Sequence, residues 1–127
     1  MTLVGLDVSH QTSLPRSAWE TAQPLASPSA RLLYEVGKQA FTDFGRDGLF
    51  LHDPLALGIA LDPTLGGYDQ RTVEVVLDGE ERGRTISSPG GLHKVVTSVD
   101  VNRFLARMAE AYGIPVEAML QPSYRPV

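Results

Sequence analysis

Cysteine is absent from this sequence of 127 residues. Without cysteine, the protein can form no disulfide bond, no thiolate metal site and no cysteine nucleophile. Basic residues are also few: 11 lysine and arginine residues stand against 15 aspartate and glutamate residues, and they form no basic block. Because nucleic-acid binding needs concentrated positive charge, we do not expect a nucleic-acid partner.

Long hydrophobic runs are absent as well. No run reaches the length that crosses a membrane, and residues 1–7 lack the positively charged start of a signal peptide. We therefore expect a cytoplasmic protein with no membrane partner. Of what is present, the length suits one domain, and a hydrophobic content of 43% is ordinary for a globular protein.

Strand patterns recur along the chain. The apolar run at residues 2–7 does not alternate, which predicts a parallel strand buried on both faces. Asp78-Gly79 predicts an antiparallel hairpin between residues 72–77 and 83–86, and a further strand is expected at residues 94–99. The predicted fold class is α/β, with mainly parallel strands, flanking helices and an antiparallel hairpin.

Helices are predicted where a capping residue or a proline precedes apolar spacing of about 3.6 residues. Their expected ranges are 13–22, 27–44, 54–60 and 100–112. The second should pack on the core through an apolar stripe made of Leu32, Leu33, Val36, Ala40, Phe41 and Phe44. Residues 114–127 are expected to form a loosely attached tail.

The stretch that points to chemistry is the junction at residues 48–60, where a short apolar strand ends in His52-Asp53-Pro54 and an apolar helix follows. α/β proteins bind ligands at the carboxyl ends of strands, so this imidazole and carboxylate are candidates for a site. A structural interpretation is also open, because Asp53 is a favoured N-cap and Pro54 suits the first helical position.

Two aromatic residues allow alternative interpretations. Trp19, the single tryptophan, could stack on a nucleobase, but its large apolar surface favours core packing. Tyr68 lies in the turn-rich segment 61–68, which could reach over a ligand with Tyr68 as a substrate-binding lid side chain. A plain surface loop is the simpler interpretation of that segment.

Four segments in a fixed order carry a resemblance to a known family. They are Leu3-Val4-Gly5-Leu6-Asp7-Val8-Ser9-His10, the junction at His52, Val73-Glu74-Val75-Val76-Leu77-Asp78-Gly79 and Val99-Asp100-Val101-Asn102-Arg103-Phe104. They resemble the C-terminal part of the inosine-uridine preferring nucleoside hydrolases. That family has a Leu-Asp-Val-Thr-like strand end, a His-Asp-Pro-x-Ala element, a Val-Glu-Val-x-Leu-Asp-Gly hairpin and an Asp-Val-x-x-Phe helix.

The resemblance implies an enzyme that cleaves the N-glycosidic bond of ribonucleosides to base and ribose, with calcium holding the attacking water and the ribose hydroxyls. His52 matches the motif histidine proposed to contact the substrate and protonate the departing base, because imidazole exchanges a proton near neutral pH. Asp53 matches the calcium-binding carboxylate. Ser9 stands where the family usually has threonine, whose main-chain carbonyl is a calcium ligand, and Asp7 and His10 would only support that position.

Other parts of the family's pattern are missing. Calcium prefers about six to eight oxygen ligands, and Asp53 with the Ser9 carbonyl supplies only part of that set. The family's Asp-x-Asp-x-Gly-x-Asp-Asp element and its Asn/Glu-containing ribose-binding segment do not occur here. We therefore expect residues 1–127 to be the C-terminal segment of a nucleoside hydrolase domain that binds calcium weakly or not at all and is inactive alone.

Two accounts stay open on the sequence. The chain is part of an enzyme whose other segment is lost or supplied by a separate N-terminal chain, or it is a non-catalytic binding or assembly domain that retains the fold. In the second account self-association must cover the apolar sheet surface, so a homo-oligomer is expected. A zinc hydrolase is disfavoured, because His10, His52 and His93 show no His-x-x-x-His spacing.

Overall fold

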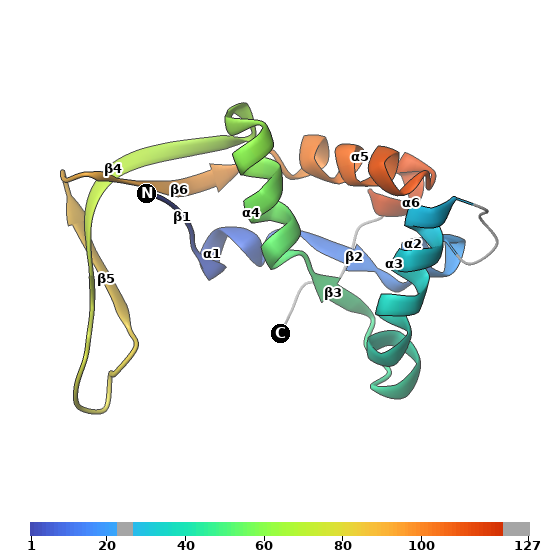
Figure 1. Cartoon of the computed structure of the whole chain (residues 1–127), viewed down its shortest axis with the longest axis horizontal. Helices are drawn as coiled ribbons and strands as arrows, with labels where there is room; N and C mark the ends of the chain where they lie inside the picture. The colour runs from blue at the N-terminus through green and yellow to red at the C-terminus, as the bar shows by residue number, and fades with distance from the viewer. Residues whose placement is uncertain (23–26, 121–127) are drawn as a thin grey trace.

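Figure 1 shows the computed structural model, which describes residues 1–22 and 27–120. The elements in chain order are β1 (Thr2–Val4), α1 (Leu6–Ser9), β2 (Ser13–Pro15), α2 (Arg16–Ala22), α3 (Pro28–Lys38), the π-helical η1 (Gln39–Asp43), β3 (Gly48–Phe50), α4 (His52–Leu61), the 3-10 turn η2 (Pro63–Leu65), β4 (Gly66–Val75), β5 (Thr85–Pro89), β6 (His93–Val99), α5 (Val101–Tyr112) and α6 (Val116–Met119). In these described ranges no helix combines the length and apolar character needed to cross a membrane.

The larger sheet has the strand order β1-β6-β4-β5. β1 pairs parallel with β6, from Thr2 opposite Lys94 to Val4 opposite Val96. β4 pairs antiparallel with both β6 and β5. The predicted α/β class with an antiparallel hairpin is confirmed, although β1 and β6 form the one parallel pair among the described strands.

The first strand is shorter and more exposed than predicted. β1 ends at Val4, and Thr2 is exposed while Leu3 and Val4 are only partly buried. The chain then turns into α1, where the backbone N–H of Ser9 donates to the carbonyl of Gly5 at 3.0 Å. Ser9 therefore ends a single helical turn that follows the strand.

β2 and β3 form a separate antiparallel pair, in which Ser13 lies opposite Phe50. The prediction that Ser13 caps a helix is wrong, because its segment pairs with β3 and α2 begins only at Arg16. Next to this pair, the backbone N–H of Leu51 donates to the carbonyl of Thr12 at 3.0 Å. These bonds hold the segment after α1 beside the segment that enters α4.

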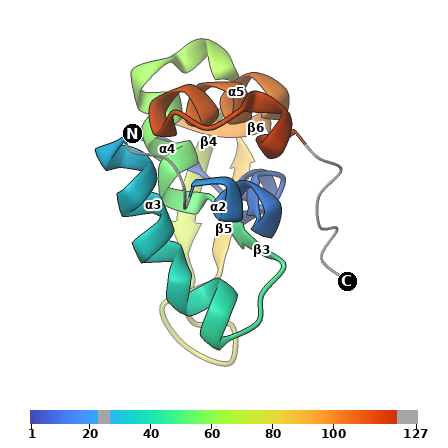
Figure 2. The same cartoon turned by 90° about the vertical axis from the view of Figure 1, so that its right-hand side faces the viewer.

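The helices α2, α3, α5 and α6 gather at one end of the molecule, and the β4–β5 hairpin lies at the other (Figures 1 and 2). Among the largest fully buried side chains are Leu14, Phe41, Leu55, Leu65, Val96, Phe104 and Met119. The core therefore extends from the helical end to β6, an inner strand of the larger sheet, through Val96.

Trp19 packs in this core. It is 4% exposed, and its ring stacks on Tyr34 and Phe41 with ring centroids 4.7 and 4.9 Å away. Its N–H donates to the carbonyl of Tyr34 at 2.9 Å. A Cβ atom at Gly37 would lie 2.7 Å from the indole, so glycine at that position lets α3 approach the ring. Core packing, which the sequence analysis favoured over base stacking, is confirmed.

The predicted apolar stripe of the second helix is partly wrong. α3 begins as expected, because the Ser27 hydroxyl accepts from the backbone N–H of Ala30 at 3.1 Å. Leu33 and Phe41 are buried, but three stripe residues are more than 60% exposed, namely Leu32, Val36 and Phe44. Apolar spacing identified the helix, but Leu32 and Val36 lie beside the face that packs on the core.

The last long helix follows the prediction. Asp100 accepts from the backbone N–H of Arg103 at 3.1 Å and caps α5, and Gly113 ends it with φ of 69°. The predicted loose tail is wrong for residues 114–120, because Ile114 and Met119 are buried and α6 forms there. The rest of that tail, residues 121–127, lies outside the described residues.

The segment 61–68 is not a plain loop. After η2 the chain enters β4 at Gly66, so Tyr68 is a strand residue. The hairpin predicted from Asp78-Gly79 is confirmed by the antiparallel pairing of β4 with β5. It extends away from the body of the molecule (Figure 1), and every residue of β5 is exposed.

Candidate active site

Two segments 43 residues apart meet at the N-terminal end of α4. The hydroxyl oxygen of Ser9 lies 2.8 Å from Nδ1 of His52. Ser9 is 2% exposed at the end of α1, and His52 is the partly buried first residue of α4. The structure thus brings together two residues that the sequence analysis assigned to one site.

The rings of His10 and Phe50 lie close to that of His52. The ring centroids of His10 and Phe50 lie 4.6 Å apart, and those of His10 and His52 lie 5.2 Å apart. Phe50 and His52 are 5.6 Å apart. His10 is exposed. This ring cluster offers a partly exposed aromatic surface, the kind of surface that packs against planar groups.

Asp53 faces different surroundings. It is the exposed second residue of α4, and in the described part of the chain its carboxylate makes no hydrogen bond or ion pair. The N-cap position is Leu51, so the alternative in which Asp53 caps the helix and Pro54 begins it is wrong. Asp53 lines a groove of about 860 Å³ between α4 and α5, whose other lining residues include Leu57, Leu61, Phe104, Arg107 and Met108.

The predicted calcium ligands fit only in part. The main-chain carbonyl of Ser9 already accepts two hydrogen bonds, from the backbone N–H of Thr12 at 3.1 Å and from its hydroxyl at 3.0 Å. A carbonyl oxygen has two lone pairs, so this one has no free position for a cation. Within residues 1–22 and 27–120, no group of three or more His, Asp or Glu could hold a metal ion. Of the two predicted ligands, Asp53 is the one whose carboxylate has no hydrogen-bond or ion-pair partner within the described residues.

Tyr68, the predicted lid residue, lies apart from this pair. Its hydroxyl donates to the carbonyl of Pro63 at 2.6 Å, and Nζ of Lys94 lies 6.0 Å from its ring centroid. It lines a second groove, of about 390 Å³, with Val4 and Ile59 among its neighbours. Among the described residues no hydrogen bond or ring contact joins Tyr68 to the Ser9–His52 pair, and its contact with substrate stays a prediction.

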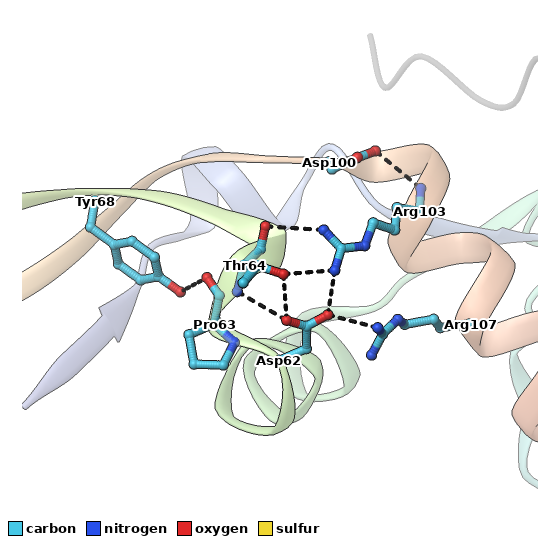
Figure 3. Close-up of polar contacts among 7 residues, drawn as sticks. All are labelled: Asp62, Pro63, Thr64, Tyr68, Asp100, Arg103 and Arg107. Carbon is cyan, nitrogen blue, oxygen red and sulfur yellow. Dashed lines mark hydrogen bonds and ion pairs between the residues drawn. The ribbon is translucent and has the colours of Figure 1, made fainter.

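The sequence analysis missed a second polar cluster, at the C-terminal end of α4 (Figure 3). Asp62 Oδ1 accepts from the backbone N–H of Thr64 at 3.0 Å and from its hydroxyl at 2.6 Å. Asp62 Oδ2 lies 2.7 Å from a guanidinium nitrogen of both Arg103 and Arg107. The cluster therefore ties the end of α4 to α5.

The same partners set the acidity of Asp62. The hydroxyl of Thr64 is the main cause that lowers the pKa of this carboxyl below 3.8, and partial burial opposes it. The backbone N–H of Thr64 and the charges of Arg103 and Arg107 lower the pKa further. A signal for this cluster existed in the sequence, because Asp62-Pro63-Thr64 suits a local Asx turn and the two arginines are spaced i,i+4 on one helix.

The chain is similar in sequence to one known protein family. The sequence model described as "Inosine-uridine preferring nucleoside hydrolase" matches residues 1–106. No curated protein sequence matches the chain.

Solved structures do match. A purine-preferring ribonucleoside hydrolase from Gardnerella vaginalis is 32% identical over 88% of this chain and 39% of its own, with a TM-score of 0.70. A plant nucleoside hydrolase is 25% identical over 90% of this chain and 41% of its own, with a TM-score of 0.76. An inosine-uridine preferring nucleoside hydrolase from Bacillus anthracis, 19% identical over 88% of this chain and 36% of its own, shares the fold with a TM-score of 0.71. The chain thus spans about two fifths of the length of the solved structures it matches.

Proposed function

We propose, from the premise that the chain belongs to the inosine-uridine preferring nucleoside hydrolase family, that it provides one wall of the active site of a ribonucleoside N-ribohydrolase. The observation that carries the proposal is the N-terminal end of α4. There His52 is held by Ser9 at 2.8 Å, and the open carboxylate of Asp53 is its neighbour in the chain. Both residues lie within the range that the family model matches.

In the proposed reaction, the bond between ribose C1′ and the base nitrogen breaks with its electron pair on the base. The oxygen of a water molecule bonds to C1′, and the water gives up a proton to a carboxylate. His52 donates a proton to the departing base, a contribution worth about 10²–10⁴ in rate. The ring cluster of His10, Phe50 and His52 gives that base a planar neighbour.

Calcium enters the proposal through Asp53. When bound, the ion would supply charge to hold the water and the ribose hydroxyls. Because the Ser9 carbonyl is saturated by Thr12, Asp53 is the ligand that this chain offers, and the other oxygens must come from elsewhere. We therefore propose that the chain alone binds calcium weakly or not at all and does not turn over nucleosides.

The matching partner in this proposal is a separate chain that carries the family's remaining carboxylates. The catalytic role of this chain is tested with a chimaera in which the chain replaces the matching segment of the Gardnerella vaginalis hydrolase. With inosine and uridine as substrates and calcium present, we expect hydrolysis by the chimaera and none by the chain alone. Hydrolysis by the chain alone would refute the need for a partner, and an inactive but folded chimaera would refute the catalytic role.

A second candidate function is a non-catalytic binding or assembly domain. It is favoured by the groove beside Asp53, where Leu57 and Leu61 are 61% and 77% exposed. Large exposed apolar patches mark interaction surfaces, so this account proposes a homo-oligomer that covers the groove. Light scattering on the chain distinguishes the two accounts, since a defined oligomer that buries Leu57 supports assembly and a monomer contradicts it. In both accounts we propose a cytoplasmic location.

A further inference from the structure

We propose that Ser9 is a positioning residue for His52 and that it acts through its hydroxyl, not through its main-chain carbonyl. The inference rests on the proposed function, because it assigns how the proton donor of that reaction is held. The observation behind it is the contact of 2.8 Å between the Ser9 hydroxyl oxygen and Nδ1 of His52.

Each polar group of Ser9 has an identified partner. The backbone N–H donates to the carbonyl of Gly5 at 3.0 Å, and the carbonyl accepts twice from Thr12. The side-chain hydroxyl is the remaining group, and its contact in the described structure is His52. Since Ser9 is 2% exposed, water has little access to this hydroxyl. The hydroxyl is therefore the group through which Ser9 reaches the site.

The direction of this hydrogen bond follows from the cost of a buried donor without an acceptor. Among the described residues, the Ser9 hydroxyl has no second contact that could accept its hydrogen. In the neutral ring the hydroxyl therefore donates to Nδ1, and the hydrogen of the imidazole lies on Nε2. When the ring is charged, the hydroxyl rotates and accepts from Nδ1–H. Nε2 carries a hydrogen in both states.

A hydroxyl is the partner that gives this result. A main-chain carbonyl at the same place would accept from Nδ1–H and would leave Nε2 of the neutral ring without a hydrogen. The group that protonates a departing base is the charged ring, which donates the proton from Nε2 and is left neutral, while the Ser9 hydroxyl accepts from Nδ1–H. The hydroxyl therefore suits both states of the ring, because it can accept from the charged form and donate to the neutral one. The rings of Phe50 and His10, 5.6 and 5.2 Å away, limit reorientation of the imidazole.

The test is nitrogen-15 NMR of the histidine rings in the full chain, above the pH at which they titrate. The chain has three histidines, so His10→Gln and His93→Gln variants assign the His52 signals. We expect neutral His52 with hydrogen on Nε2 and an acceptor-type Nδ1. In Ser9→Ala the minor tautomer should rise about fivefold, which corresponds to about 1 kcal/mol for one hydrogen bond.

Two variants separate the hydroxyl from the rest of Ser9. Ser9→Thr keeps a hydroxyl and should restore the wild-type tautomer. Thr12→Val removes a hydrogen bond to the Ser9 carbonyl and should leave the His52 tautomer unchanged. A tautomer that responds to Thr12→Val as strongly as to Ser9→Ala would overturn the assignment to the hydroxyl.

A wild-type chain with hydrogen mainly on Nδ1 of neutral His52 would contradict the proposal, as would a Ser9→Ala chain with an unchanged tautomer. If Ser9→Ala does not fold, the spectra of the wild type and of Ser9→Thr still decide. The expected tautomers together with an inactive chimaera would refute the reaction while keeping the role of Ser9, so the two failures are distinguishable.

Discussion

Helix α4 carries the same dipeptide at both ends, Asp53-Pro54 at the start and Asp62-Pro63 just past the end. The two aspartates have opposite surroundings. Asp62 binds Thr64 through one oxygen and two arginines through the other. Asp53 is exposed, and its carboxylate has no hydrogen bond or ion pair within the described residues.

The difference indicates a structural role for one end of α4 and a chemical role for the other. A carboxylate with both oxygens engaged stabilises the fold and has little capacity left for a ligand. The carboxylate of Asp53 has no such partner and follows directly in sequence a histidine that Ser9 holds, so it is available to bind a ligand. We interpret the C-terminal end of α4 as its anchor to α5 and the N-terminal end as its contribution to the active site.

The largest expected effect is on activity, and it should differ between substitutions at the two ends of α4. In the chimaera, His52→Ala removes the proton donor and should lower kcat by about 10²–10⁴. Asp62→Asn lies outside the site and should keep kcat close to that of the unmodified chimaera, measured with inosine at saturation. Equal losses in the two variants would remove the distinction between the ends.

The next largest expected effect is on the free energy of unfolding, and it concerns the packing of α4. Leu55 is 0% exposed, so Leu55→Ala should destabilise the chain by about 2–5 kcal/mol through lost packing and a cavity. Leu57 is 61% exposed on the same helix, and Leu57→Ala should stay within about 0.5 kcal/mol of the wild type. Urea unfolding followed by the fluorescence of Trp19 measures both variants.

Much of this arrangement could be predicted from local sequence signals. The Asp100 cap and Gly113 mark the ends of α5, and Asp78-Gly79 marks the hairpin, because caps and turns depend on a few neighbouring residues. The polar residues that follow an apolar strand mark the junction at His52. Its meeting with Ser9 matches the resemblance that placed both residues at one site.

The errors share a different cause. The sequence pattern predicts Ser13 as a helix cap, but Ser13 pairs with β3. It predicts Ile114 in a loose tail, but Ile114 is buried. Leu32 and Val36 looked like core residues and are exposed. Each outcome depends on which distant element covers a segment, and local patterns do not contain that information. The saturation of the Ser9 carbonyl by Thr12 is a contact of the same kind that only coordinates reveal.

A smaller effect is expected on Tm when matched substitutions are made at the two ends of α4. Asp62→Asn should lower Tm, because the carboxylate that pairs with Arg103 and Arg107 is lost. Asp53→Asn makes the same change in charge and should leave Tm almost unchanged, since surface changes have little effect. Calorimetric scans at neutral pH and low salt check this order, and an equal fall in both variants would contradict it.

The smallest effect is the acid dependence of the anchor. The pKa of Asp62 is lowered below 3.8 in the folded protein, so its stabilising contribution is present above that pH and is lost as the pH falls through the folded pKa. The difference in Tm between the wild type and Asp62→Asn should therefore hold down to about pH 4 and shrink at lower pH. A difference that grows in acid would have the wrong sign.

The most direct test of the central claim, that this chain offers one open ligand of a cation site and lacks the others, is calorimetric titration with calcium. We predict no binding in the micromolar range by the 127-residue chain. In the chimaera we predict binding that Asp53→Asn abolishes and Asp62→Asn preserves. Micromolar calcium affinity in the chain alone, or binding by the chimaera that does not depend on Asp53, would contradict the account.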